Sequence, residues 1–198
     1  MGMGKSTAAT FLSEFGAEVV DTDDLAREVV APGQPALDEV RRAFGDDILL
    51  TGGTLDRAAL ARRVFADATE RRKLEQILHP RIRAQWQAQL AAWRRAGVPL
   101  AVVVIPLLFE TVVASSFDDT ICVACEAATQ FDRLRARGWT DVEIGQRVAA
   151  QMPVDRKMEL CTFVVWTEGE IEVHREQLRR ITRCAGMAPR DASGECVE

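Results

Sequence analysis

Met1-Gly2-Met3-Gly4-Lys5-Ser6-Thr7 opens the chain and matches the second half of the phosphate-loop pattern G-x-x-x-x-G-K-[ST]. In a complete loop of this kind, a buried strand leads in and a helix leads out. Backbone N–H groups around Gly4 would face one concavity, the Lys5 ammonium would contact the outer phosphates, and the Ser6 hydroxyl would ligate Mg²⁺. The dipole of the following helix adds to this attraction for an anion. The alternative is a chance G-K-S match ahead of an ordinary amphipathic helix, with Ala8, Phe11, Leu12 and Phe15 on its apolar face.

Composition sets the class of protein. The 198 residues are 47% hydrophobic, which suits one α/β domain with an accessory lobe and excludes a disordered chain. A net charge of −5 argues against a nucleic-acid partner, because neutralising phosphates requires a basic face. The sequence has neither a long apolar run nor a basic segment followed by an apolar one near its start. We therefore expect a cytoplasmic protein with no membrane partner, either a monomer or a weak homo-oligomer.

The cysteines give no framework for disulfides. Their number is odd and their spacing irregular: Cys122, Cys125, Cys161, Cys184 and Cys196. Reduced thiols are therefore expected. The chain has only two histidines and no second C-x-x-C, so a thiolate metal site is not expected either.

Helical and strand-like periodicities alternate along the chain. Helices are expected at about residues 5–15, 23–31, 36–44, 55–66, 68–95, 127–137, 140–151 and 168–183, and strands at about 17–21, 98–105, 119–124 and 162–166. Gly52-Gly53 suggests a small turn or hairpin, and Pro80 should kink or divide the helix over 68–95. Residues 184–198 have no periodicity and are expected to form a disordered tail.

Strands separated by helices predict a parallel sheet covered by helices on both faces. Ligands bind such sheets beyond the carboxyl ends of the strands. The first expected strand is followed by Asp21-Thr22-Asp23-Asp24, the second by Pro106–Glu110, and the third by a helix bearing Arg133, Arg135 and Arg137.

The acidic run after the first strand has two interpretations. One carboxylate of the pair Asp21 and Asp23 can face a ligand while the other caps the next helix, although a helix cap without chemistry fits the local sequence as well. Arg27, one turn on, can pair with Asp23 or with a ligand phosphate, or can form a surface salt bridge.

Together, G-M-G-K-S-T, D-T-D-D-L-A-R, A-P-G-Q-P-A-L, H-P-R-I-R at 79–83, P-L-L-F-E at 106–110 and the late arginines resemble the dephospho-coenzyme A kinase family over about residues 1–180. The resemblance implies a three-layer P-loop kinase fold of the α/β class, with a core at about 1–31 and 98–183, a helical substrate lobe at 32–97 and a lid at 133–158. It also implies ATP-dependent, Mg²⁺-assisted phosphorylation of the ribose 3′-hydroxyl of dephospho-coenzyme A.

The resemblance also implies roles for residues. Lys5, Asp23 and Arg137 would be catalytic, with Asp23 the general base and Asp21 its neighbour near the metal. ATP would contact Gly2, Met3, Gly4, Lys5, Ser6, Thr7 and Arg133, with Ser6 on the metal. The substrate would contact Asp21, Arg27, His79, Arg83, Leu107, Leu108 and Glu110.

Four further residues bear on this scheme. Val104 stands where many members carry an aspartate, which would shift more of the Mg²⁺ coordination to Ser6 and the Asp21/Asp23 pair. Arg156 and Lys157 would either close the lid or form an exposed charged turn. Without the family, His79 would be taken for a histidine at a helix end.

The family fold also has a central strand before the phosphate loop, between the strands at 99–105 and 119–124. Without it, unpaired buried backbone groups would each cost about 1–3 kcal/mol. We therefore expect a native start roughly eight to twelve residues upstream, the length of one strand plus Gly-Gly. Intact mass of the native protein tests this, and a native Met1 terminus with full activity would contradict it.

Two alternative functions remain. A P-loop kinase of another small metabolite fits the phosphate loop but not P-L-L-F-E or H-P-x-I-R. A catalytically impaired binding protein of the same fold would show no detectable ATP binding.

Overall fold

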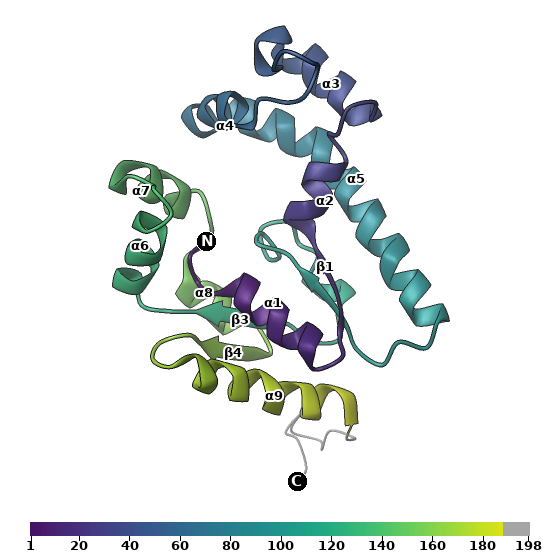
Figure 1. Ribbon diagram of the computed structural model, residues 1–198, viewed down its shortest axis with the longest axis vertical. Helices are drawn as coiled ribbons and strands as arrows, with labels where there is room; N and C mark the ends of the chain where they lie inside the picture. The colour runs from purple at the N-terminus through teal and green to yellow at the C-terminus, as the bar shows by residue number, and fades with distance from the viewer. Residues whose placement is uncertain (188–198) are drawn as a thin grey trace. The chain divides into compact units, whose positions relative to one another are not determined.

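The computed structural model describes residues 1–187, which form two compact units (Figure 1). The first unit combines Met1–Val19 with the chain from Val98 onward, and the second is Val20–Gly97. The expected core included residues up to 31, so the observed boundary lies earlier. The acidic run at 21–24 therefore belongs with the helical unit.

Four short strands form the sheet structure. They are β1 (Glu18–Asp21), β2 (Ala101–Val104), β3 (Ile121–Ala124) and β4 (Phe163–Trp166). β1 lies beside β2, where Glu18 N–H donates to Leu100 O at 3.0 Å, and β3 pairs with β4 in parallel register from Ile121↔Phe163 to Ala124↔Trp166. Among the described residues these are two separate two-stranded sheets, and no ladder joins β2 to β3.

Helix α1 (Lys5–Glu14) follows the phosphate loop and forms as its spacing predicts. Ala8, Phe11 and Leu12 are buried and pack with Val165 of β4 and Leu178 of α9 (Ile171–Met187). The helix ends in a Schellman motif, because Gly16 N–H donates to Ser13 O and Ala17 N–H to Leu12 O. Gly16 has φ +92°, a conformation that glycine adopts without strain.

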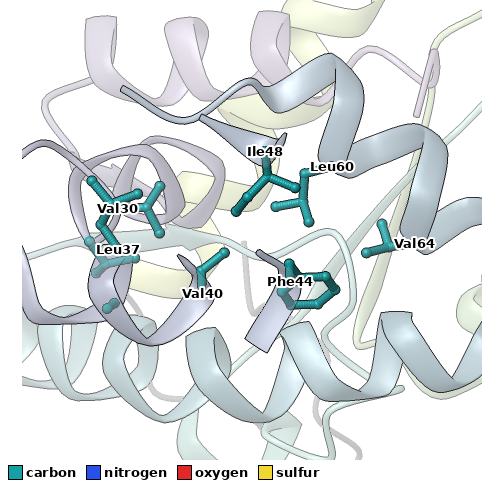
Figure 2. Packing of buried hydrophobic residues seen from close by; sticks show 9 residues of the cluster. Val30, Leu37, Val40, Phe44, Ile48, Leu60 and Val64 are labelled. Carbon is teal, nitrogen blue, oxygen red and sulfur yellow. The ribbon is translucent and has the colours of Figure 1, made fainter. Parts of the chain in front are cut away.

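The second unit is helical. Its elements are α2 (Thr22–Glu28), α3 (Pro35–Phe44), the 3₁₀ turn η1 (Asp46–Ile48), α4 (Arg57–Ala66) and α5 (Ala68–Arg95). Val40, Phe44, Ile48, Leu60 and Val64 point toward one another in its core (Figure 2). Burying side chains of this size stabilises the fold by roughly 1.5–3 kcal/mol each. The expected turn at Gly52-Gly53 is present, closed by a bridge between Leu49 and Leu55.

Helix α5 corrects the expected division at Pro80. It runs without a break over 28 residues, with Pro80 inside it. Leu74, Ile77 and Leu78 before the proline and Ile82 after it all pack against the same core, so burial on both sides offsets the lost backbone hydrogen bond. The Arg81 guanidinium also donates to Ile77 O at 2.6 Å.

The remaining helices of the first unit are α6 (Ala127–Arg135), α7 (Asp141–Ala149) and α8 (Val154–Leu160), with the 3₁₀ turn η2 (Ala114–Ser116) before β3. Helix α8 was not predicted from the sequence, because its seven residues are too few to show a helical period. Helix α9 extends to Met187, so residues 184–187 are helical and the expected tail begins too early. The rest of that tail, 188–198, lies outside the described residues.

Cysteine chemistry differs from the expectation at one position. Cys122, Cys125 and Cys161 are free thiols, as expected, whereas Cys184 is disulfide-bonded. Burial, together with the neighbouring Cys161, raises the pKa of Cys122 to about 11. This thiol is therefore a poor nucleophile at neutral pH. Cys196 lies outside the described residues.

No helix among residues 1–187 is long and apolar enough to cross a membrane.

Val112 is under backbone strain. It has φ 54° and its side chain is 81% exposed, although β-branched residues rarely adopt positive φ. Val112→Gly should therefore raise the free energy of unfolding by about 1 kcal/mol, or the melting temperature by roughly 2–4 °C. Val112→Ala removes exposed apolar surface but keeps a Cβ, so it should gain less. An equal gain from both variants in calorimetry would show that strain is not the cause.

Candidate functional site

The phosphate loop ends in a helix terminus that carries no capping side chain. Gly4, the N-cap of α1, has φ 92°, and Ala8 N–H donates to its carbonyl at 3.0 Å. The N–H groups of the first turn, from Lys5 to Thr7, have no acceptor within the helix. Such a terminus, with a lysine as its first residue, suits an anion.

The carbonyl groups of the loop accept hydrogen bonds from other parts of the first unit. Gln130 Nε2 donates to Met1 O at 2.8 Å, and Thr167 Oγ1 donates to Met3 O at 3.1 Å. Arg133 reaches Gly2 O at 3.4 Å, and Cys125 Sγ lies 3.9 Å from the same oxygen. Three consecutive carbonyls are thus fixed by α6, Cys125 and the residue after β4.

Close packing requires glycine at two loop positions. A Cβ on Gly2 would lie 3.0 Å from Leu134 Cγ, and one on Gly4 would lie 3.2 Å from Thr167 Cγ2. Both residues also have positive φ, 70° and 92°. A side chain at either position would push the loop away from α6 or from Thr167.

The two predicted lid arginines differ in their surroundings. Arg133 donates to Thr167 Oγ1 at 2.8 Å and to Thr167 O at 2.6 Å, so its guanidinium is occupied within the protein. Arg137 is exposed and lies beyond the end of α6 at Arg135, outside the helix that was expected to carry it. Arg135 is also exposed and pairs with Asp132 and Asp141.

A cavity of about 130 Å³ adjoins the loop. Lys5, Met1 and Met3 line it from the loop, and Cys122 lines it from β3. The other lining residues come from the segment after β2, from β3 and from the chain between α6 and α8: Ile105, Pro106, Leu108, Phe109, Ile121, Val123, Gln130, Val148, Gln151, Met152, Pro153, Val154 and Lys157.

Lys157, which lines this cavity, forms an ion pair with Glu110. Lys157 Nζ lies 2.8 Å from Glu110 Oε1, and these side chains are only 15% and 21% exposed. Lys157 also donates to Pro106 O at 3.0 Å, and Met152 N–H donates to Glu110 Oε1 at 2.9 Å. Lys157 is therefore not part of an exposed charged turn, although Arg156 beside it is exposed and pairs with Glu159.

The electrostatics of Glu110 follow from these contacts. Burial raises the pKa of this carboxyl, but the Lys157 ammonium and the Met152 N–H outweigh burial and leave the pKa lowered. Glu110 is ionised at neutral pH. Its second oxygen, Oε2, is buried without a hydrogen-bond partner.

The predicted base and its neighbours lie in the second unit. Asp21 accepts the Asp23 N–H at 2.8 Å, which makes Asp21 the N-cap of α2, while the Asp23 side chain is exposed. Arg27 pairs with Asp24 at 2.6 Å rather than with Asp23, and both partners are more than 60% exposed, at 64% and 63%.

The remaining predicted substrate contacts are divided between the units. His79 and Arg83 lie on α5, His79 partly buried and Arg83 exposed. Leu108 lines the cavity of the first unit. Leu107 instead holds the turn after β2, because its carbonyl accepts the Thr111 hydroxyl at 2.7 Å.

Gln130 and Thr167 were not among the residues predicted for the site. Thr167 directly follows β4, so the rule that ligands bind beyond strand ends could have drawn attention to it. Gln130 carries no sequence signal, since its role depends on how α6 packs against the loop.

Among the described residues, no group of three or more His, Cys, Asp or Glu side chains could enclose a metal ion. Ser6, the predicted metal ligand, is exposed in the first turn of α1.

Comparison with known proteins identifies relatives over most of the chain. A family model described as dephospho-CoA kinase matches residues 1–172. The chain is 44% identical to a dephospho-CoA kinase of Geobacter metallireducens over 176 residues, 88% of each chain. It is 39% identical to that of Geobacillus kaustophilus, over 91% of this chain and 90% of the relative.

Two solved structures have similar folds. A protein from Thermus thermophilus superimposes with a TM-score of 0.78 at 33% identity, covering 96% of this chain and 94% of that one. A dephospho-CoA kinase from Campylobacter jejuni gives a TM-score of 0.69 at 20% identity, covering 94% and 93%. These neighbours confirm the expected α/β P-loop fold.

Proposed function

The chain belongs to the dephospho-CoA kinase family, and on that premise we propose that it transfers the γ-phosphate of ATP to the ribose 3′-hydroxyl of dephospho-CoA. The observation that carries the proposal is the phosphate loop. The helix that follows the loop has no capping side chain, and Lys5 lies in its first turn. The loop carbonyls of Met1 and Met3 are already hydrogen-bonded to Gln130 and Thr167. The first-turn amides are left to bind phosphate oxygens.

We assign the remaining catalytic and substrate-binding roles to the other predicted residues. Asp23 accepts the proton of the ribose hydroxyl, because Asp21 is engaged as a helix cap while the Asp23 carboxylate is exposed. Arg137, exposed beyond α6, stabilises the negative charge that develops on the transferred phosphoryl group. The residues that we assign to dephospho-CoA binding are Arg27, His79 and Arg83 from the second unit, and Leu107, Leu108 and Glu110 from the first.

Mg²⁺ fits this site as an ion shared with the nucleotide. It takes few protein ligands in kinases and keeps several waters, which suits the exposed Ser6 and the lack of a cluster of acidic ligands within residues 1–187. When bound, the ion neutralises charge on the phosphates.

The test is phosphate transfer by the purified chain. ADP formation should depend on dephospho-CoA, and the product should be heavier by one phosphate, which a 3′-nucleotidase removes. A matched reaction with AMP or adenosine as acceptor should form little ADP. Equal ADP formation with any of these acceptors, or with none, would contradict the proposed substrate.

A further inference from the structure

Thr167 lies where three parts of the first unit meet. It follows β4, and its N–H donates to Ala124 O at 2.8 Å, which extends the β3–β4 ladder by one bond. The residue is only 5% exposed. Its backbone is thus fixed to the sheet independently of its side-chain contacts.

The Thr167 side chain faces the phosphate loop. The hydroxyl accepts from Arg133 at 2.8 Å, so its own proton is available to Met3 O, 3.1 Å away. The methyl group packs close to Gly4: a Cβ added to Gly4 would lie only 3.2 Å from the methyl carbon of Thr167. Hydroxyl and methyl therefore contact two neighbouring residues of the loop.

Arg133 sets the direction of that hydroxyl. Its second nitrogen donates to Thr167 O at 2.6 Å, so the guanidinium binds both oxygens of one residue. A guanidinium has no acceptor to offer, so the hydroxyl proton must point elsewhere, and Met3 O is within reach.

We propose that Thr167 is a positioning residue for the nucleotide phosphates: held by Arg133, it fixes the Met3 carbonyl and Gly4 so that the amides after Gly4 converge on one anion. This inference rests on the proposed ATP-binding function. It assigns Arg133 a role in shaping the loop, in addition to any contact with ATP.

Thr167→Val tests the hydroxyl, because valine keeps both branches of the side chain but removes the oxygen that accepts from Arg133 and donates to Met3 O, while the bond from Arg133 to the carbonyl of residue 167 remains. ADP and ATP affinity, measured by calorimetry, should fall about tenfold. Adenosine affinity should change less than about twofold, since adenosine carries no phosphate. Thr167→Ser keeps the hydroxyl and should restore most of the affinity for ADP.

Thr129→Val is the matched control. Its hydroxyl donates to Glu168 Oε2 at 3.0 Å, next to Thr167, rather than to the phosphate loop. This variant should bind ADP as the wild type does. Melting curves should show all three variants folded at the assay temperature.

Three results would overturn the inference: unchanged ADP affinity in Thr167→Val, an equal loss for adenosine and ADP, or no recovery in Thr167→Ser. Nucleotide binding without transfer to dephospho-CoA would instead contradict the proposed function and leave the role of Thr167 intact. A wild-type chain that binds neither ADP nor ATP would overturn both.

Discussion

Lys5→Ala should reduce phosphate transfer by about 10²–10³-fold, the usual cost of removing one preorganised positive or hydrogen-bonding group from a charged transition state. Lys5 is the first residue of α1 and lines the cavity beside the loop, where it can meet the outer phosphates. The loss should appear in kcat as well as in the KM for ATP, because charge on the phosphates grows during transfer.

The control for this variant is Arg180→Ala. It removes one positive charge from the same unit, but Arg180 is 79% exposed on α9. Steady-state rates for Arg180→Ala should match the wild type. If Lys5→Ala kept more than a tenth of the wild-type rate, the chance-match interpretation of G-K-S would regain support.

Breaking the Glu110–Lys157 ion pair should have the largest effect on stability. Lys157→Met leaves a mostly buried carboxylate without its cation, which costs about 3 kcal/mol, or roughly 6–12 °C in melting temperature. The double variant Glu110→Met/Lys157→Met should recover most of this loss, since no unpaired charge remains. Arg156→Met, one position away and 63% exposed, should change the melting temperature by less than about 2 °C.

The ion pair also predicts a pH dependence. The pKa of Glu110 is lowered, so its contribution to stability is complete above the ordinary glutamate pKa of about 4.3 and is lost as the pH falls through the folded value. The difference in melting temperature between wild type and Lys157→Met should therefore shrink between pH 7 and pH 3. A difference that stayed constant over this range would mean that packing, rather than charge, links the two side chains.

Local sequence predicted most of the elements. Helix α1 and its end at Gly16, the valine-rich β2 and the turn at Gly52-Gly53 depend on spacing, backbone preference and neighbours a few residues away. One error arose where distant packing outweighed a local rule. Pro80 should interrupt a helix, yet α5 continues because residues on both sides of it are buried in one core.

The site, like the fold, has features that follow from local sequence and features that depend on distant packing. By itself, the sequence determined the phosphate-loop chemistry, G-K-S-T at the start of an amphipathic helix, because that signal is contained in seven adjacent residues. Only the tertiary structure decided which side chains hold the loop. Arg133 and Thr167 are 34 positions apart, and Thr167 and Met3 are 164 apart. Periodicity describes which face of an element is buried, but it does not specify which distant group will lie opposite, since that depends on how whole elements pack.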